Sequence, residues 1–283
     1  MDNKTYHDMT HLISASMLKT ANKSMKHYWQ EYVNPEREPK KPTRNMEIGT
    51  VFHTLLLEPE NHKNVFTIVP EGIDKRTKDG KALFAEIEAS GLIALKNDEF
   101  NDTVKMVESA LNHPLASVFL DGSLPHKIES VHIWQVDGIG FKMKTDYEIK
   151  PCARFPNGAI IDAKKAADAT ENGFAKSSFN LGYHIQAAHY ALGFMDKYRT
   201  SELPDVIFLA VESDAPYVCQ WFKADDQFIE YGMSERERLI ELIAEARTSG
   251  TYKGYSDELT PLSLPSWVSR TLENEEIEGI EYV

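Results

Sequence analysis

The strongest constraint on this fold is a pair of alternating segments joined by the dipeptide Asp137-Gly138. Residues 127–136 and 139–149 alternate polar with apolar side chains, which is typical of strands with one buried face. Asp-Gly suits a two-residue turn, because that turn needs a positive φ at both central residues. The two segments are therefore predicted to form an antiparallel hairpin. In a plain two-residue turn the numbers of opposed residues sum to 275, as 137 and 138 do.

Around this hairpin the sequence indicates helices, then further strands, then helices again. Apolar residues at helical spacing predict helices over Ser14–Val33, Met46–Leu57, Lys81–Leu95, Asp98–Leu111, Tyr183–Tyr198 and Asp226–Thr248. Short apolar segments predict strands over Val65–Val69, Ala159–Lys165, Val206–Val211 and Tyr217–Phe222. This order predicts an α/β fold with one mixed β-sheet flanked by helices.

The length of 283 residues allows one large domain, and 42% hydrophobic with 27% charged residues is typical of a soluble globular protein. We expect a single domain over residues 1–250, with a mainly helical part at 1–115 and a sheet core at 125–225. Residues 251–283 are interrupted by prolines and acidic, so we expect a loosely packed or partner-bound tail. No apolar run is long enough to span a membrane, and the polar start argues against a secretory signal.

The two cysteines limit the cofactors and the compartment. Cys152 and Cys219 lie far apart in the sequence, and neither belongs to a C-x-x-C motif. This spacing excludes a disulfide framework, a zinc cluster and an iron–sulfur site. We expect a reduced, cytoplasmic protein whose thiols have no role.

The net charge of −13 argues against a nucleic-acid partner, because phosphates are normally bound by Lys and Arg. The charge is distributed unevenly, however. Residues 273–281 carry five carboxylates and no basic side chain. Two basic clusters lie elsewhere, formed by Lys40, Lys41 and Arg44 and by Lys75, Arg76, Lys78 and Lys81. Composition alone therefore leaves the partner open.

Carboxylates are predicted to gather on adjoining strands. Side chains two residues apart on a strand share a face, so Asp162 and Lys164 lie together. The hairpin register places Glu129 directly across from Asp146, and opposed like charges destabilise a sheet. A hard divalent cation such as Mg²⁺ is the natural compensation. The expected faces of the second hairpin strand are Ile139, Phe141, Met143, Thr145 and Tyr147 on one side, and Lys142, Lys144 and Asp146 on the other.

Three carboxylates beside an ammonium suit the metal-assisted hydrolysis of a phosphodiester. The metal would polarise the phosphate and help to ionise a water, while Lys164 would position that water or neutralise the transition state. A lysine accepts a proton only when its pKa is strongly depressed, so we expect an electrostatic role for Lys164.

D-x-K also occurs by chance, and a charged strand face is usually the solvated side of a sheet. What favours a site is the helix that follows, in which Tyr183, Gln186 and Tyr190 share one face at i, i+3 and i+7. A purely structural Tyr/Gln stripe is the alternative for that helix. Its opposite face, which we expect to meet the core, carries Ile185, Ala188, Leu192 and Met195.

Six segments, in order from about residue 6 to 250, resemble the exodeoxyribonuclease VIII (RecE-type) family of the PD-(D/E)XK nuclease superfamily. They are Gly49-Thr-Val-Phe-His53 with Leu57-Glu-Pro, Arg76-Thr-Lys-Asp-Gly80, Glu129-Ser, Lys142-Met-Lys144-Thr-Asp146, Asp162-Ala-Lys164 and Tyr183-His-Ile-Gln186-Ala-Ala-His-Tyr190. Ser14-Ala-Ser16 is similar to the Ser-x-Ser opening of the family. The resemblance implies a PD-(D/E)XK nuclease-like mixed sheet flanked by helices.

The same resemblance implies site residues. Asp146 and Asp162 would bind the metal together with the backbone carbonyl of Ala163. Lys164 would be the catalytic lysine, Glu129 a supporting acid and His53 the active-site histidine. Gln186 and Tyr190 would contact DNA or brace the site. The alternative for His53 is a buried helical histidine that bonds a carbonyl.

Phosphate contacts are expected from basic and aromatic side chains, since Arg binds phosphate bidentately. For each of them a solvated surface role is the alternative. The candidates are Arg44, Arg76, Lys78, Lys142, Lys144 and Tyr183.

The family implies a 5′-to-3′ exonuclease on linear double-stranded DNA that needs Mg²⁺, for which Mn²⁺ can substitute. It also implies a ring-shaped homo-oligomer, and a single-strand-annealing recombination protein that receives the 3′ single strand. The sequence departs from the family at Lys144, where an Arg is usual, and at Ala163 and Lys165, which replace β-branched neighbours. These departures leave the chemistry intact and make substrate preference less certain.

Two other readings stay open. One is a different PD-(D/E)XK nuclease, such as an endonuclease or a Cas4-type exonuclease, although the Cas4 type normally carries four iron–sulfur cysteines. The other is a catalytically silent DNA-binding module that keeps the fold. The intact Asp146, Asp162 and Lys164 argue against the silent module.

Overall fold

The computed structural model describes residues 3–38 and 41–264. The contacts of the chain divide it into two units, Met1–Tyr252 and Lys253–Val283. The expected acidic run at 273–281 lies outside the described residues. All elements discussed below belong to the first unit.

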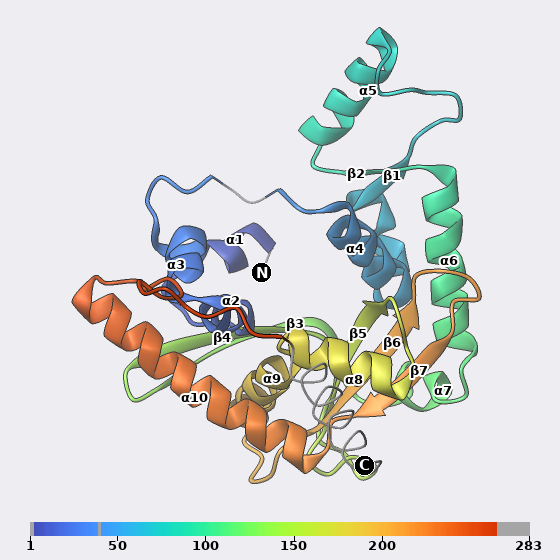
Figure 1. Ribbon diagram of the computed structural model, residues 1–283. Coiled ribbons are helices and arrows are strands. Elements are labelled where there is room, and N and C mark those ends of the chain that lie inside the picture. Colours follow the sequence, from blue (N-terminus) through green and yellow to red (C-terminus); the bar gives the residue numbers. More distant parts are fainter. Residues whose placement is uncertain (1–2, 39–40, 265–283) are drawn as a thin grey trace, which may run out of the picture. The chain divides into compact units, whose positions relative to one another are not determined.

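The centre of the first unit is a five-stranded mixed sheet, visible in Figure 1. Its strands, in spatial order, are β3 (His126–Val136), β4 (Ile139–Ile149), β5 (Ala159–Ala166), β6 (Asp205–Glu212) and β7 (Cys219–Lys223). Neighbouring strands are antiparallel except β5 and β6, which are parallel. The predicted α/β fold with a mixed sheet flanked by helices is confirmed.

Helices cover both faces of this sheet (Figure 1). Because strand side chains alternate, Ile160 packs into one core and its neighbour Ile161 into the other. On the side of Ile160 lie α2 (Ala15–Lys23), α8 (Glu171–Asn180), α9 (Tyr183–Tyr198) and α10 (Asp226–Ser249). On the side of Ile161 lie α4 (Arg44–Leu57), α6 (Asn97–Asn112) and α7 (Ala116–Phe119).

The predicted hairpin is confirmed together with its register. Asp137 and Gly138 have φ of 49° and 81°, as a two-residue turn of this type requires. Pairs such as Val136↔Ile139 and Ser130↔Thr145 sum to 275. The turn alone therefore determines which residues of β3 and β4 face each other.

The predicted faces of β4 are wrong in one respect. Phe141 and Met143 pack into the core beneath α9, but Tyr147 packs into the opposite core although it has the same parity. The change of side occurs at Glu129 and Asp146, the one position at which the ladder of paired residues is interrupted. Glu129 has a φ of 47°, a backbone conformation that a strand with period two does not contain. This local twist turns the end of β4 over.

Several boundaries differ from the sequence-based expectation. The helix expected over Ser14–Val33 is interrupted, because Ser24 adopts an extended conformation and caps a new helix through its bond to the N–H of His27, 3.2 Å away. The pieces are α2, α3 (Met25–Tyr28) and a π-helical turn, Trp29–Val33.

The helix expected over Lys81–Leu95 is α5 (Lys78–Ala89). It ends before Gly91, whose φ is 74°, and the chain continues into β2 (Ile93–Leu95). This strand pairs in parallel with β1 (Phe66–Ile68), forming a small second sheet that was not expected. The remaining elements are α1 (Asn3–Asp8), also not expected, and the 3-10 turn Pro59–Asn64.

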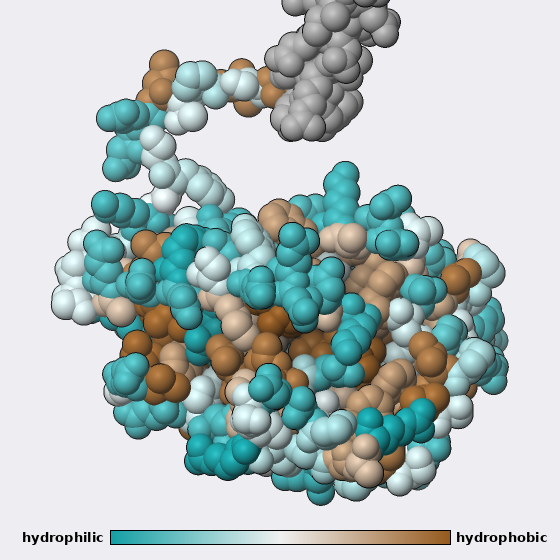
Figure 2. Space-filling model, turned by 90° about the horizontal axis from the view of Figure 1, so that it is seen from below, coloured by the Kyte–Doolittle hydropathy of each residue, from teal (hydrophilic) through white to brown (hydrophobic). Residues whose placement is uncertain are grey.

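The face of the molecule seen in Figure 2 is mixed in hydropathy. Figure 2 shows apolar side chains gathered among hydrophilic ones on the face seen from below. Among the described residues, no helix has both the length and the apolar composition that crossing a membrane would require.

Candidate active site

The candidate site lies where β4 and β5 separate. The two strands pair only between Tyr147–Ile149 and Ala159–Ile161. Two residues beyond Ile161, the backbone N–H of Ala163 donates to the Asp146 carboxylate at 2.9 Å, so a side chain takes the place of a strand partner. The N–H and C=O of one strand residue point to the same side, so the Ala163 carbonyl faces this gap as well. The separation therefore opens a space lined by polar groups.

Three side chains from three elements converge at this opening. His53 from α4, Glu129 from β3 and Asp146 from β4 each offer a ligand atom, and these atoms all lie within 4.8 Å of one another. The Nδ1 atom of His53 is 3.5 Å from Oδ2 of Asp146, so this histidine does not simply bond a carbonyl. The three side chains are partly exposed, which leaves the group accessible.

Glu129 reaches the group because of its backbone. The interrupted ladder and the φ of 47° at Glu129 belong to the same position. A positive φ at a residue other than Gly, Asn or Asp is costly, and such conformations concentrate at functional sites. The carboxylate of Glu129 also forms an ion pair with Lys144.

Asp162 and Lys164 form the adjoining part of the site. Asp162 is almost fully buried, and its Oδ1 accepts from the Gln186 amide at 2.9 Å. Its Oδ2 forms an ion pair with Lys164, whose ammonium also lies 4.9 Å from the centre of the Tyr183 ring. The sequence grouped Asp162 with Asp146 as metal ligands, but in the structure Asp162 turns towards Lys164 and Gln186.

The charges at the site influence one another. Burial alone would lower the pKa of Lys164, but the carboxylates of Asp162 and Asp146 outweigh it and raise that pKa. Burial and the nearby Asp146 charge raise the pKa of Asp162. Burial also acts to raise the pKa of Asp146, but His53 and Lys164 hold it below its usual value. Lys164 is thus a permanent cation beside a buried acid, which fits an electrostatic role.

Helix α9 provides the inner wall of the site. Gln186 is buried and holds Asp162, and Tyr183 lies against Lys164. Burial and the charges of nearby carboxylates raise the pKa of Tyr190 well above its usual value, so its hydroxyl keeps its proton. The face of this helix expected to meet the core does so at Ile185 and Ala188, which are fully buried, while Leu192 and Met195 are partly buried. Gln186 on the other face is buried as well, because α9 packs against the sheet and also against α2 and α10.

Lys142 and Lys144 are not presented to DNA in the way the sequence suggested. Lys142 is only 3% exposed and its Nζ donates to the backbone carbonyl of Tyr6. Burial lowers the pKa of Lys142 to about 8. Lys144 forms an ion pair with Glu129. A solvated strand face was the alternative for these residues, but Tyr6 of the N-terminal helix α1 contacts Lys142 and Glu129 pairs with Lys144.

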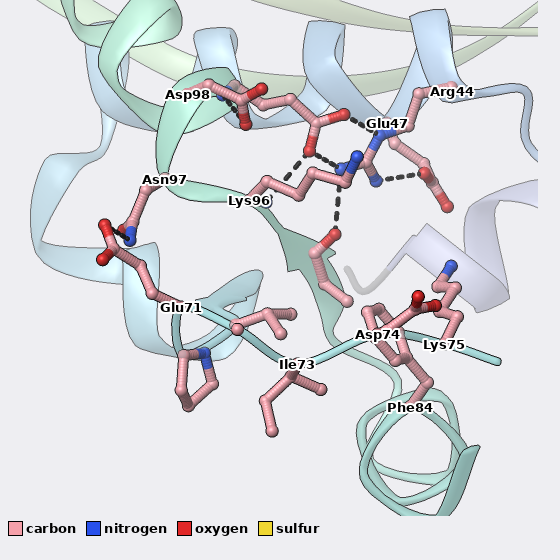
Figure 3. A pocket seen from close by; sticks show the side chains of 15 residues that line it. Arg44, Glu47, Glu71, Ile73, Asp74, Lys75, Phe84, Lys96, Asn97 and Asp98 are labelled. Atoms are coloured by element: carbon pink, nitrogen blue, oxygen red, sulfur yellow. Dashed lines mark hydrogen bonds and ion pairs between the residues drawn. The ribbon is translucent and has the colours of Figure 1, made fainter. Parts of the chain in front are cut away.

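Arg44 belongs to a separate pocket of about 1070 Å³, shown in Figure 3. Its guanidinium donates to Glu99 at 2.8 Å, to Glu47 at 2.7 Å and to the carbonyl of Ala94 at 2.9 Å. Further carboxylates line the same pocket, at Glu71, Asp74 and Asp98. In this pocket the Arg44 guanidinium is thus paired with two carboxylates, Glu47 and Glu99.

The other predicted phosphate contacts lie at the start of α5. Arg76 is exposed and pairs with Asp74 at 2.6 Å. Lys78 is the first residue of α5 and is exposed. The structure therefore does not bring these two residues into the group formed by His53, Glu129 and Asp146.

The donor set at the opening fits a divalent cation. Carboxylate oxygens are the ligands that Mg²⁺ and Mn²⁺ prefer, and an imidazole adds a donor that suits transition metals better than Mg²⁺. His53, Glu129 and Asp146 would hold the ion, with the Ala163 carbonyl and Asp162 at the border of the same opening. An ion there would also offset the repulsion between neighbouring carboxylates.

Sequence reasoning missed two residues near the site. The ammonium of Lys19 from α2 donates to the Gln186 carbonyl oxygen at 3.0 Å. Glu58 follows α4, and its pKa is raised by burial and by the charge of Glu129. Glu58 stood within a recognised motif but was given no role. Lys19 had no signal in the sequence, because its partner is 167 positions away.

Comparison with known proteins places the chain by sequence and by fold. Residues 14–260 match the family described as a PDDEXK-like domain of unknown function (DUF3799). A crystal structure of a "Putative exonuclease" from Eubacterium rectale is similar in fold, with a TM-score of 0.65 at 14% identity over 96% of this chain and 98% of that one. A crystal structure of SSO0001 gives a TM-score of 0.31 at 12% identity over 70% of this chain and 84% of that one. No curated protein matches the chain.

The family match carries most weight, because it covers nearly the whole chain, including every residue of the site. At 14% identity the likeness to the Eubacterium rectale structure shows the fold alone. That fold is the mixed sheet flanked by helices described above. The chain therefore belongs to the PDDEXK-like family, and its α/β architecture is that of the PD-(D/E)XK nuclease superfamily.

Proposed function

We propose that this protein is a divalent-metal-dependent exonuclease that degrades one strand of linear double-stranded DNA from 5′ to 3′, leaving a 3′ overhang. The observation that carries the proposal is the convergence of His53, Glu129 and Asp146 beside the Asp162–Lys164 pair. These five side chains come from four elements, so only the tertiary fold brings them together. Such an arrangement of acids and one permanent cation suits phosphodiester hydrolysis.

The residues of the chain have separate tasks in this reaction. A bound divalent cation supplies polarisation of the phosphate and a more acidic water. His53, Glu129 and Asp146 would hold the ion. Lys164 stays protonated beside Asp162 and neutralises negative charge that develops on the phosphate.

The resemblance to exodeoxyribonuclease VIII-type proteins supports the finer parts of the proposal. These are the 5′-to-3′ polarity, Mg²⁺ with Mn²⁺ as a substitute, a ring of identical subunits, and an annealing protein that receives the 3′ strand. The ring would in turn account for the net charge of −13, because a negative exterior would keep DNA away from all but a locally basic channel.

The test is a digestion of linear duplex, nicked circle and closed circle, each with Mg²⁺ or with EDTA. We expect Mg²⁺-dependent loss of the linear duplex alone, abolished by Asp162→Ala and by Lys164→Ala. Lys165→Ala is the matched control, since Lys165 is the next residue of the same strand but bonds Asn45 instead, at 3.1 Å. End-labelled substrates report the polarity, and light scattering of the eluted protein reports the subunit number.

The other outcomes are decisive as well. Cutting of closed circles would show an endonuclease of the same superfamily. Loss of no substrate with any divalent ion, while DNA is still bound, would show a catalytically silent DNA-binding module. Either result overturns the proposal.

A further inference from the structure

In the contact between Lys19 and Gln186, the lysine is the hydrogen-bond donor and the amide oxygen is the acceptor. Lys19 Nζ donates to Gln186 Oε1 at 3.0 Å, and Gln186 Nε2 donates to Asp162 Oδ1 at 2.9 Å. The three side chains thus form a chain of donors and acceptors from α2 through α9 to β5. Gln186 is 5% exposed and Asp162 2%, so water competes little for either bond.

The ammonium of Lys19 selects one of the two orientations of the Gln186 amide. An ammonium can only donate hydrogen bonds, and an ionised carboxylate can only accept them. The observed orientation satisfies both neighbours. The flipped amide would turn its NH₂ group to the ammonium and its oxygen to the carboxylate, and both contacts would be repulsive. Without the ammonium, only the Asp162 contact would bias the amide.

The stem of Lys19 is held in place. A Cβ atom at Gly182 would lie 3.0 Å from Lys19 Cγ, so the lysine passes closely over the residue that precedes α9. Its ammonium lies 5.6 Å from the centre of the Tyr183 ring, the ring that Lys164 also approaches. The ammonium groups of Lys19 and Lys164 therefore both lie close to the Tyr183 ring.

We propose that Lys19 is a positioning residue, which holds the Gln186 amide with its NH₂ towards Asp162 and so fixes the Asp162 carboxylate beside the metal group. With Oδ1 bonded to Gln186, Oδ2 forms the ion pair with Lys164. The inference rests on the proposed function in one respect, namely that the carboxylates serve a bound cation. Partners of metal-site residues commonly change metal affinity by about 10–100-fold when they are removed.

The test is a double-mutant cycle that measures Mn²⁺ binding to the full chain by electron paramagnetic resonance. The variants are Lys19→Met, Gln186→Met and the two combined. We expect each single substitution to weaken Mn²⁺ binding by about tenfold. We expect Lys19→Met to add nothing when Gln186→Met is already present, because Lys19 acts through the amide.

Two further variants separate this role from a purely structural one. Lys19→Arg keeps a donor and should restore most of the binding. Lys23→Met changes an exposed lysine on the same helix and should leave binding unchanged. Thermal melting checks that every variant is folded, and Lys19→Gln replaces Lys19→Met if the latter is not. Gln at position 19 offers no fixed charge, so it should weaken binding in the same direction.

Unchanged Mn²⁺ affinity in folded Lys19→Met would overturn the proposal. The proposal would also be overturned if Lys19→Met lowered the Mn²⁺ affinity equally with and without Gln186→Met and also weakened the binding of duplex DNA in EDTA. That pattern would show that Lys19 contacts a phosphate directly. Failure of the proposed function is distinct. If the protein binds Mn²⁺ and shows the Lys19–Gln186 coupling but cleaves no DNA, the proposed function fails and the positioning role of Lys19 stands. If the wild-type protein binds no Mn²⁺, both proposals fail.

Discussion

At the scale of single residues, Lys164 shows how a neighbour decides what a side chain can do. Burial would lower the pKa of Lys164, yet Asp162 and Asp146 raise it, so a role as proton acceptor is unfavourable. We therefore predict that Lys164→Arg, which keeps the charge, retains at least about tenfold more activity than Lys164→Met. Single-turnover cleavage of linear duplex measures the difference. Equal inactivity of the two folded variants would contradict the electrostatic role.

A second residue, His189, is predicted to link stability to pH. It is fully buried, and burial together with the charge of Arg236 lowers its pKa to about 3 from 6.5. Between these values the unfolded chain binds a proton that the folded chain does not, so stability falls as the pH drops from 6.5 towards 3. The contribution is about 1.4 kcal/mol per pH unit at most.

His189→Gln is the matched variant, because an amide can also donate to the Lys142 carbonyl and accept from Arg236, as His189 does. We expect the free energy of unfolding of this variant to depend less steeply on pH over the same window. Urea denaturation at pH 7, 6 and 5 checks this. The same slope in both proteins would mean that His189 is not responsible.

At the scale of elements, close packing of α9 and α10 depends on Gly232. A Cβ atom there would lie 2.1 Å from the carbonyl oxygen of His184. Gly232→Ala would gain about 1 kcal/mol of helix propensity, but it would force the helices apart. We predict a net loss of about 1–3 kcal/mol in the free energy of unfolding.

Gly49 in α4 is the matched control, because a Cβ atom there meets nothing within 4 Å. Gly49→Ala is predicted to stabilise the protein by up to about 1 kcal/mol through helix propensity alone. The melting temperatures of both variants, compared with that of the wild-type protein, test these two predictions. A stabilising Gly232→Ala would show that α10 can move away from α9 at little cost.

At the scale of the whole molecule, Tyr252 marks the end of the first unit. Its ring stacks on Tyr28, with centroids 6.4 Å apart, and Arg247 donates to the Tyr28 hydroxyl at 2.6 Å. We predict that a chain of residues 1–252 keeps the melting temperature and the metal-dependent activity of the full chain. A chain of residues 1–246 should melt several degrees lower, because it loses Arg247 and its contacts to Tyr28, Thr10 and His11.

Circular dichroism and the digestion assay measure both chains. Loss of folding in the 1–252 chain would show that Lys253–Val283 takes part in the first unit. Equal melting of the two truncated chains would show that Arg247 does not contribute to stability.

The sequence by itself determined the local parts of this protein. Asp137-Gly138 specified the hairpin and its register, since a turn acts only on the strands beside it. The motif residues Asp146, Asp162 and Lys164 could be recognised in their strands, and the bounds of α9 were predicted as observed. These features depend on neighbours in the chain.

Only the tertiary structure decided which side chains meet. His53 joins Glu129 and Asp146, Asp162 turns to Gln186 and Lys164, and Lys142 is covered by α1. The twist at Glu129 turned the end of β4 towards the other core, which no alternation of residues indicates. The reason is physical: such contacts join residues up to 237 positions apart, and the packing of whole elements, not local preference, sets the distances between them.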